Sequence, residues 1–101
     1  MGNKLINLVL EKTYYEKGFF NVRVEASDLI RNDEGTINIF LDHSTSPLIA
    51  RVDRNSNLNK TPRIFGGAIL KTWFQTNFKL GDIVKVEIID PFNLRMERNQ
   101  N

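Results

Sequence analysis

The side chains best suited to chemistry in this 101-residue chain are concentrated between Arg51 and Arg63. This segment combines four basic residues, one acidic residue and three asparagines, namely Arg51, Arg54, Lys60 and Arg63, then Asp53, then Asn55, Asn57 and Asn59. Guanidinium groups bind guanine edges, carboxamides bind adenine edges, and both donate to phosphates. The segment therefore predicts a site for an anionic partner, with nucleic acid as the best match. The same composition also fits a solvated loop whose charges only aid solubility.

A second polar segment runs from Ser27 to Thr36 and contains Arg31 and Asn32. Its centre, Asn32 to Gly35, has the residue types of a tight turn. If this segment and Arg51–Arg63 leave the same edge of the fold, we expect them to form two arms beside one ligand.

Catalysis is not expected, because the chain has one histidine and no cysteine. His43 is followed by Ser44 and Thr45, and Asp42 is adjacent, but no orienting acid has the spacing of a known triad. We interpret His43 as a turn residue. The carboxylates are scattered without the spacing of metal ligands. The sequence predicts a protein that is not an enzyme and that binds no metal, cofactor or small-molecule substrate.

The bulk composition is that of one soluble globular domain, with 41% hydrophobic and 26% charged residues. The net charge of +2 is unevenly distributed, since residues 1–50 hold five basic and seven acidic side chains and residues 51–101 hold nine and five. No apolar run approaches the roughly 18 residues that span a bilayer, and the N-terminus lacks the pattern of a signal peptide. We expect a cytoplasmic protein without a membrane partner.

Alternating apolar residues predict six or seven strands separated by turns. The expected segments are residues 5–10, 19–26, 37–42, 48–53, a short extended piece at 63–65, 84–88 and 92–97. Glu16 to Gly18 reads as a turn, and Ser27-Asp28 ends the second strand, with a possible single turn through Leu29-Ile30. On the second and third strands Phe19 and Phe40 fall on the outward positions.

One amphipathic helix is expected over residues 68–77. Its apolar side is formed by Ile69, Leu70, Trp73, Phe74 and Phe78. This spacing favours core packing of Trp73 and Phe74 over a role as stacking platforms for bases. Gly66-Gly67 precedes the helix and either cradles a phosphate or allows the helix to pack closely, and we favour close packing.

The order of these features resembles the DNA-binding pseudobarrel superfamily. The likeness rests on Trp73-Phe74, Phe78, Leu80, Gly81-Asp82 and Val84-Lys85-Val86, with Ser27-Asp28 after an early strand and Arg63 before the helix. It covers about residues 18–96. The superfamily includes the plant B-three domain and the recognition domains of EcoRII-type restriction enzymes. The adjacent Trp-Phe pair departs from the plant spacing, so the restriction-type branch is the closer likeness.

The resemblance implies a mainly β fold, a seven-stranded open pseudobarrel of mixed and antiparallel strands with one main short helix. It implies two arms in the major groove of duplex DNA. The first, Ser27–Thr36, would offer Arg31 and Asn32; the second, Arg51–Arg63, would offer Arg51, Arg54, Asn55, Asn57, Lys60 and Arg63. Residues 1–17 would be an N-terminal extension with a strand, 18–97 the domain, and 98–101 a frayed tail. No nuclease motif is present, so any cleavage would belong to another domain or subunit.

The leading expectation is therefore sequence-specific binding of double-stranded DNA without catalysis. If about four phosphates are neutralised, log affinity should fall with log salt at a slope near −4. Two alternatives stay open. One is a protein-interaction module with a basic loop, anchored by Phe19 and Phe40. The other is a single-strand or RNA binder with exposed aromatic residues on adjacent strands.

Overall fold

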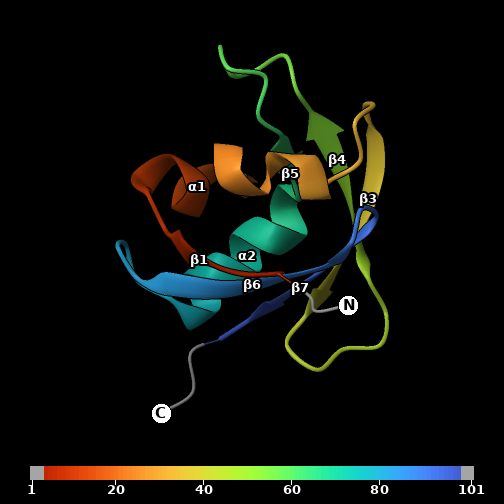
Figure 1. Cartoon of the computed structure of the whole chain (residues 1–101). Helices are drawn as coiled ribbons and strands as arrows, with labels where there is room; N and C mark the ends of the chain where they lie inside the picture. The colour runs from red at the N-terminus through yellow and green to blue at the C-terminus, as the bar shows by residue number, and fades with distance from the viewer. Residues whose placement is uncertain (1–3, 99–101) are drawn as a thin grey trace.

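The computed structural model describes residues 4–98, whose alternating apolar positions form one mixed sheet of seven strands curled into a half-barrel (Figure 1). The mainly β fold class expected from the sequence is confirmed. The strands are β1 (Lys4–Val9), β2 (Phe19–Asn21), β3 (Gly35–Leu41), β4 (Leu48–Asp53), β5 (Arg63–Phe65), β6 (Ile83–Asp90) and β7 (Asn93–Glu97). The helices are α1 (Lys12–Lys17), a 3-10 helix (Val24–Leu29) and α2 (Gly67–Asn77).

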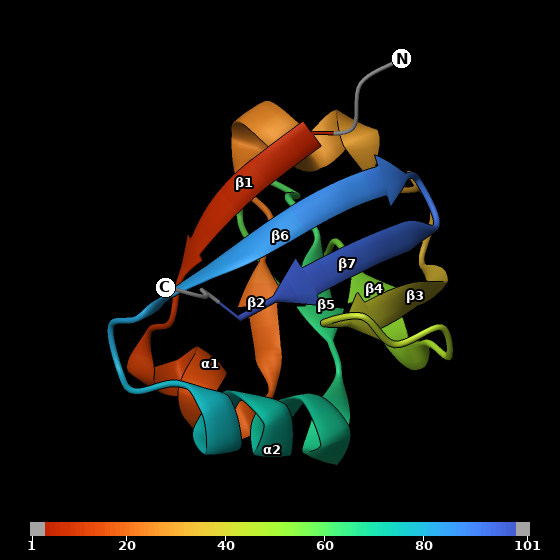
Figure 2. The same ribbon diagram turned by 90° about the horizontal axis from the view of Figure 1, so that it is seen from below.

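The strands are ordered β1-β6-β7-β3-β4-β5-β2 across the sheet. β3 pairs with β7 in parallel, whereas the other neighbouring pairs are antiparallel. This arrangement brings the end of β2, the start of β3, the end of β4 and the start of β5 to one end of the half-barrel, which we call the arm end. At the opposite end, the helix end, α1 leads into β2 and β5 leads into α2 (Figure 2).

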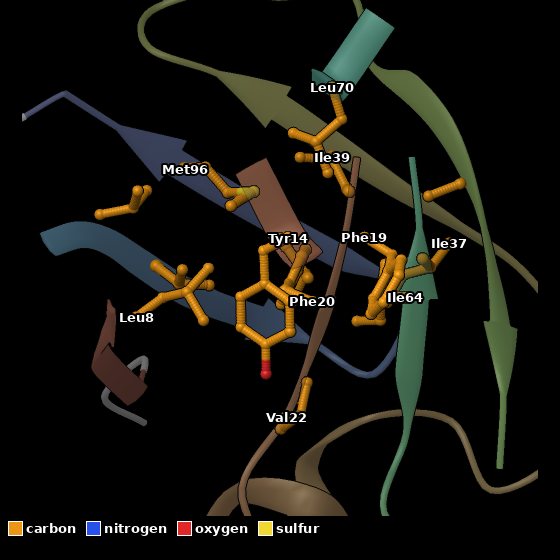
Figure 3. Packing of buried hydrophobic residues seen from close by; sticks show 14 of the residues in the cluster. Leu8, Tyr14, Phe19, Phe20, Val22, Ile37, Ile39, Ile64, Leu70 and Met96 are labelled. Carbon is orange, nitrogen blue, oxygen red and sulfur yellow. The ribbon is translucent and has the colours of Figure 1, made fainter. Parts of the chain in front are cut away.

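The core forms on the concave side of the sheet because every second strand residue points inward. Figure 3 shows Phe20, Ile37, Ile39, Ile64 and Met96 gathered there from four strands that are distant in sequence. Each of these side chains is at most 1% exposed, and burying one of this size contributes about 1.5–3 kcal/mol. The alternation predicted for the strands is confirmed by buried Ile37 and Ile39 in β3, Leu48, Ala50 and Val52 in β4, Val84, Val86 and Ile88 in β6, and Leu94 and Met96 in β7. Phe92, the first apolar residue of the strand expected over 92–97, instead precedes β7 and is 50% exposed.

Helix α2 covers the core with Leu70 and Phe74, both fully buried. Trp73 is partly buried against the same core, which confirms packing as its local environment. Ile69, which the helical spacing placed on the apolar side, is instead 62% exposed. It lies about 100° around the helix from Leu70, away from the face that Leu70 and Phe74 turn to the core.

The start of α2 is closely packed through three glycines. A Cβ on Gly66 would lie 2.4 Å from the Cβ of Leu70, and a Cβ on Gly18 would lie 2.3 Å from the backbone oxygen of Gly67. The Gly66 N–H also donates to the Gly18 carbonyl at 2.9 Å. These contacts confirm the close-packing interpretation for Gly66, whereas a Cβ on Gly67 would meet nothing within 4 Å and glycine suits that position through its φ of 68°.

Three local predictions near the N-terminus were wrong. Residues 12–17, read as ending in a simple turn, form helix α1, which ends with Gly18 at a φ of 74°. The strand expected over 19–26 ends at Asn21, and residues 24–29 form a 3-10 helix with Ala26 buried. Phe19 lies on the outward side of β2 as expected, but the exposure that an interface anchor needs is wrong: it is only 7% exposed, because Tyr14 of α1 and Phe65 of β5 contact its ring.

The helix end is fastened by Asp42, which directly follows β3. Its Oδ2 accepts from the Trp73 indole N–H at 3.1 Å, and its Oδ1 accepts from the Arg98 backbone N–H at 3.0 Å. Arg98 was predicted to begin a frayed tail, but it is bonded to Asp42 through both backbone and side chain. The rest of that predicted tail, residues 99–101, lies outside the described residues. None of the helices within 4–98 has the length and apolarity needed to cross a lipid bilayer.

Candidate nucleic-acid interface

Both polar segments rise from the arm end of the half-barrel. The first arm, Ser27–Thr36, connects β2 to β3, and the second arm, Arg51–Arg63, forms the hairpin between β4 and β5. Because Gly35 pairs with Val52 and Asp53 pairs with Arg63, the two segments must start side by side. In Figure 1 the tip of the second arm is the green loop at the top, above the 3-10 helix.

Arg54 fastens the second arm to the first. Its Nη2 donates to the carbonyl oxygens of Ser27, Ile30 and Arg31 at 3.0–3.1 Å. Its Nη1 donates to the Ser27 hydroxyl at 3.0 Å and its Nε to the Arg31 carbonyl at 3.3 Å. Since each guanidinium nitrogen is engaged within the chain, Arg54 holds the arms together and is poorly placed to bind a base.

Glu34 of the first arm makes a second link between the arms. Its Oε2 accepts from the Arg54 backbone N–H at 3.3 Å and from the Asn55 side-chain amide at 2.9 Å. The Asn55 Oδ1 accepts from the Lys60 ammonium at 3.3 Å. Asn55 and Lys60 are nevertheless both exposed, so their remaining hydrogen-bonding capacity faces solvent.

The turn that starts the second arm is shaped by Asp53. Its carboxylate accepts from the Asn55 backbone N–H at 2.7 Å and from the Ser56 hydroxyl at 2.8 Å. These two hydrogen bonds, together with the Arg51 charge, hold the pKa of Asp53 below its ordinary value despite partial burial. The loop is thus ordered by an ionised carboxylate at neutral pH.

On the outer face of the sheet, Arg63 fastens the base of the second arm to β2. Its Nε donates to the Asn21 Oδ1 at 3.0 Å and its Nη2 to the Asn57 Oδ1 at 3.2 Å. The guanidinium carbon lies 4.6 Å from the centre of the Phe19 ring. Asn57 also donates to Asn21 and to the Thr61 carbonyl, each at 3.1 Å. Arg63 and Asn57 therefore maintain the shape of the arm, and Arg63 stays only half-buried.

Arg31 is occupied within the first arm. Its Nε and Nη2 donate to the two carboxylate oxygens of Asp33 at 2.9 Å, and its Nη1 donates to the Thr36 carbonyl at 2.8 Å. The hydrogen bonds from Arg31 lower the pKa of Asp33. The guanidinium carbon also lies 5.2 Å from the Phe92 ring centre, and the side chain is only 18% exposed. Its charge is thus largely neutralised locally.

Arg51 has different surroundings from these arginines. Its guanidinium carbon lies 4.5 Å from the Phe65 ring centre, its distance to Asp53 is a loose 3.9 Å, and the side chain is 61% exposed. Asn32 is exposed on the turn of the first arm. Of the eight residues predicted from the sequence, Asn32, Arg51, Asn55 and Lys60 face solvent, whereas Arg31, Arg54, Asn57 and Arg63 mainly bind the chain itself.

Two exposed residues at the arm end were not among the predicted contacts, namely Arg23, which the sequence analysis did not single out, and Asn59, which it named only as part of the second arm. Arg23 precedes the 3-10 helix with a side chain 79% exposed and only a 3.9 Å contact to Glu25. Asn59 is exposed in the second arm, with its Oδ1 accepting from the Thr61 hydroxyl at 2.9 Å. Arg23 was overlooked because the strand predicted over 19–26 included it, although a basic residue just before the first arm was a usable signal.

Side chains that could together hold a metal ion are not gathered in residues 4–98. No cluster of three or more His, Asp or Glu side chains there is arranged to hold a metal ion. His43 is exposed in the turn at the helix end, far along β3 from the arms. Comparison with known proteins found no matching family model, curated protein or solved structure. The function must therefore be argued from the arm end itself.

Proposed function

We propose that this protein binds double-stranded DNA in a sequence-selective way with its two arms, and that it does so without catalysis. The observation that carries the proposal is the fastening of two polar loops, side by side at one end of a rigid half-barrel, by the Arg54 guanidinium. A loop pair ordered before binding loses little conformational entropy when a ligand arrives. The position agrees with the two-armed geometry that the sequence resemblance implies.

The exposed side chains on the arms fall into two groups, one suited to phosphates and one suited to base edges. Arg51 and Lys60 carry charges that suit phosphates, and the positive charge of half-buried Arg63 adds to theirs at the base of the second arm, although its Nε and Nη2 donate to Asn21 and Asn57. Asn32 and Asn55 present carboxamides that suit base edges. Phosphate contacts fix the register of a protein on a duplex, and base contacts supply the sequence preference. Both classes of contact are available on the arms.

A duplex is favoured over a single strand because the outward rings of Phe65, Phe19 and Phe40 on the strands are covered, which leaves Phe92, in the turn between β6 and β7, as the half-exposed ring. Arg51 lies over Phe65, Arg63 over Phe19 and Arg95 over Phe40, at 4.5–5.1 Å from the ring centres. Single-strand binding usually requires exposed rings on which bases stack. Here the rings instead hold guanidinium groups outward, which suits a phosphate backbone.

The test is fluorescence anisotropy with labelled duplexes, beginning with selection from a random-sequence pool. We expect log affinity to fall with log salt at a slope of about −3, since Arg51, Lys60 and Arg63 would neutralise about three phosphates. Lys60→Ala should weaken binding to all duplexes about equally and reduce the slope by about 1. Asn55→Ala should instead flatten the preference between selected and unselected duplexes.

Lys71→Ala is the matched control, because Lys71 is an exposed lysine on α2 at the helix end. It should leave affinity and salt slope unchanged. Equal effects of Lys60→Ala and Lys71→Ala would mean that general charge, not the arms, attracts DNA. Preference for single-stranded over duplex competitor, or no binding at low salt, would reject the proposal.

A further inference from the structure

The half-barrel is open along a seam between its two edge strands. β1 pairs only with β6 and β2 only with β5 among the described strands. Figure 2 shows β1 at the edge of the sheet, with its free side turned away from β6. A groove of about 910 Å³ lies along this seam, with β1 on one side and Asn21–Glu25 together with Asn57–Asn59 on the other.

The backbone of β1 presents unpaired groups to this groove. Just after β1, the Leu10 N–H donates to the Asp82 carbonyl, and the Leu10 carbonyl accepts from the Gly81 N–H, each at 2.8 Å. Successive residues of a strand point their N–H and C=O groups to opposite sides. The backbone groups of Ile6 and Leu8 therefore face β6, whereas those of Leu5 and Asn7 and the N–H of Val9 face the groove. The Val9 carbonyl accepts from the Glu11 N–H at 3.0 Å.

This edge lacks the features that protect free edges in other proteins. Proline, a bulge or several charges usually prevent a partner from pairing with an exposed strand. β1 has no proline, its pairing with β6 is regular from Lys4 to Val9, and Leu5 and Val9 are 59% and 49% exposed. Across the groove, Val24 and Leu58 are 64% and 104% exposed. The seam thus combines unpaired backbone with apolar side chains on both walls.

We propose that the seam binds an extended segment of a partner protein, which adds to β1 as an antiparallel or parallel strand. A groove walled on both sides admits a single strand more readily than the sheet edge of a second copy of this chain. Strand addition gains affinity from main-chain hydrogen bonds and specificity from alternate side chains. Val24 and Leu58 line the groove opposite β1, where they would contact the apolar side chains of the bound segment.

The charges of the groove define the partner segment further. Lys4 lies at the start of β1 and Glu11 just beyond its end, and an extended chain spans that interval of seven residues in roughly 23 Å. On the opposite wall Arg23 and Glu25 lie 3.9 Å apart, so their charges offset each other. A complementary segment has an acidic residue beside Lys4, a basic residue beside Glu11 and apolar residues at alternate positions between them. This partner differs from the DNA proposed for the arms, although Asn57–Asn59 of the second arm also line the groove.

The experiment uses the full chain, labelled with ¹⁵N, and two blocked peptides as probes. These are Ac-Glu-Val-Thr-Val-Thr-Val-Lys-amide and its charge-reversed form, Ac-Lys-Val-Thr-Val-Thr-Val-Glu-amide, which together cover both strand directions. One peptide should bind saturably and slow hydrogen exchange at the amides of Leu5, Asn7 and Val9 by at least about tenfold. The amides of Ile6 and Leu8 should be protected before and after addition, because they pair with β6.

A pair of variants at one position separates backbone from side-chain effects. Asn7→Pro removes the N–H that faces the groove but none that faces β6, so the ladder between β1 and β6 persists. It should weaken peptide binding at least about tenfold. Asn7→Ala keeps the N–H and should bind within about twofold of the unmodified chain. The dispersion of the amide spectrum checks that each variant is folded. The hydrogen-exchange measurement uses the unmodified chain, so it tests the inference even if a variant does not fold.

Several results would overturn the inference. One is that neither peptide binds at about 1 mM. Another is that a peptide binds without slowing exchange at the amides of Leu5, Asn7 and Val9. A third is that Asn7→Pro and Asn7→Ala bind the peptide with equal affinity. Protection of the same amides by self-association, in the absence of peptide, would assign the seam to a second copy of the chain. Protection by a single-stranded oligonucleotide but not by peptide would assign it to nucleic acid.

Discussion

Arg51 and Arg54 lie three residues apart in the second arm and carry the same guanidinium group, but their surroundings differ. Val52 points into the core, and Arg54 follows it on the same side of the hairpin, where the carbonyls of the first arm accept its N–H groups. Arg51 points outward, lies over Phe65 and is 61% exposed. The side of the strand on which each arginine falls therefore separates a structural residue from a candidate contact.

Replacement of Arg54 tests its structural role in the absence of any ligand. Arg54→Ala should lower the free energy of unfolding by about 2–4 kcal/mol, because several charge-assisted hydrogen bonds are lost together. Arg54→Lys should recover only part of this loss, since an ammonium group cannot span the same carbonyls. Urea denaturation followed by circular dichroism provides the measurement.

Arg51→Ala is the matched control for this series. It should change stability by no more than about 0.5 kcal/mol, as expected for an exposed side chain. If Arg51→Ala and Arg54→Ala destabilise the protein equally, the hydrogen bonds of Arg54 do not hold the arms.

At the scale of elements, alternation and helical spacing predicted the framework well. The strands over 37–42, 48–53, 84–88 and 92–97 and the helix over 68–77 correspond to β3, β4, β6, β7 and α2. Their apolar residues recur at regular intervals because each element covers the same core over several turns or pleats. The strand expected near Leu5–Leu10 is likewise confirmed as β1.

The errors concern short elements, in which few residues establish a period. Val22 and Ala26 are buried and continue the alternation begun by Phe20, but Val24 between them is 64% exposed and starts a 3-10 helix. Helix α1 has one buried residue, Tyr14, so its sequence shows no apolar stripe. The burial of Phe19 was missed for the same reason, since the sequence did not predict α1, whose Tyr14 covers its ring.

The candidate site was predictable in location but not in the role of each residue. The concentration of Arg and Asn in residues 51–63 identified the second arm, and the pairing of β3 with β4 places it beside the first. Sequence cannot tell an arginine that binds carbonyls of its own chain from one that faces solvent. That difference depends on how the 3-10 helix brings Ser27 and Ile30 toward Arg54.

The contact between Gly18 and α2 gives a test at this scale. Gly18 has a φ of 74°, and a Cβ there would lie 2.3 Å from the Gly67 oxygen. Gly18→Ala should therefore cost about 2–4 kcal/mol of unfolding free energy, from backbone strain and from separation of α1 and α2. Thermal or urea denaturation measures the loss.

Gly81→Ala separates the two contributions, because Gly81 has a φ of 87° but nothing within 4 Å of a Cβ. It should cost only the strain, about 1–2 kcal/mol. Equal losses for the two variants would indicate that the close approach of Gly18 to Gly67 contributes nothing.

At the scale of the whole molecule, each end of the half-barrel is held together by its own set of polar contacts, those of Arg54 at the arm end and those of Asp42 at the helix end. The arm end carries the two polar loops, whereas the helix end is joined by Asp42, which links the end of β3 to Trp73 of α2 and to Arg98 after β7. Burial alone would raise the pKa of Asp42. Hydrogen bonds from Arg98 and Trp73, with the Arg98 charge, outweigh it and leave the pKa below its ordinary value.

This lowered pKa makes stability depend on pH in a defined direction. A carboxyl whose pKa is lower in the folded state stabilises the protein above its unfolded pKa, and the effect is lost as pH falls through the folded pKa. Asp42→Asn should reduce the unfolding free energy by about 1–3 kcal/mol at pH 7. The gap between the two proteins should narrow as pH falls from about 5 to about 2.

Urea denaturation of both proteins at several pH values measures that gap. Asn suits the left-handed backbone at position 42, where φ is 55°, so the substitution adds little strain. A gap that stays constant down to about pH 2 would show that the charge of Asp42 does not contribute to stability.

The position of β7 in the sheet has a consequence for how the protein is made. β7 lies between β6 and β3, so it joins the pair β1-β6 to the group β3-β4-β5-β2. A ribosome releases these strands in sequence order, and β7 emerges after the other six. The local pairs β3-β4 and β4-β5 can form early, whereas β1 finds its partner only when β6 emerges, and the ladders through β7 close only once residue 97 has left the exit tunnel. Until β7 emerges, the edges of β3 and β6 that it will pair with have no partner strand. During that interval the nascent chain is most prone to incorrect strand pairing.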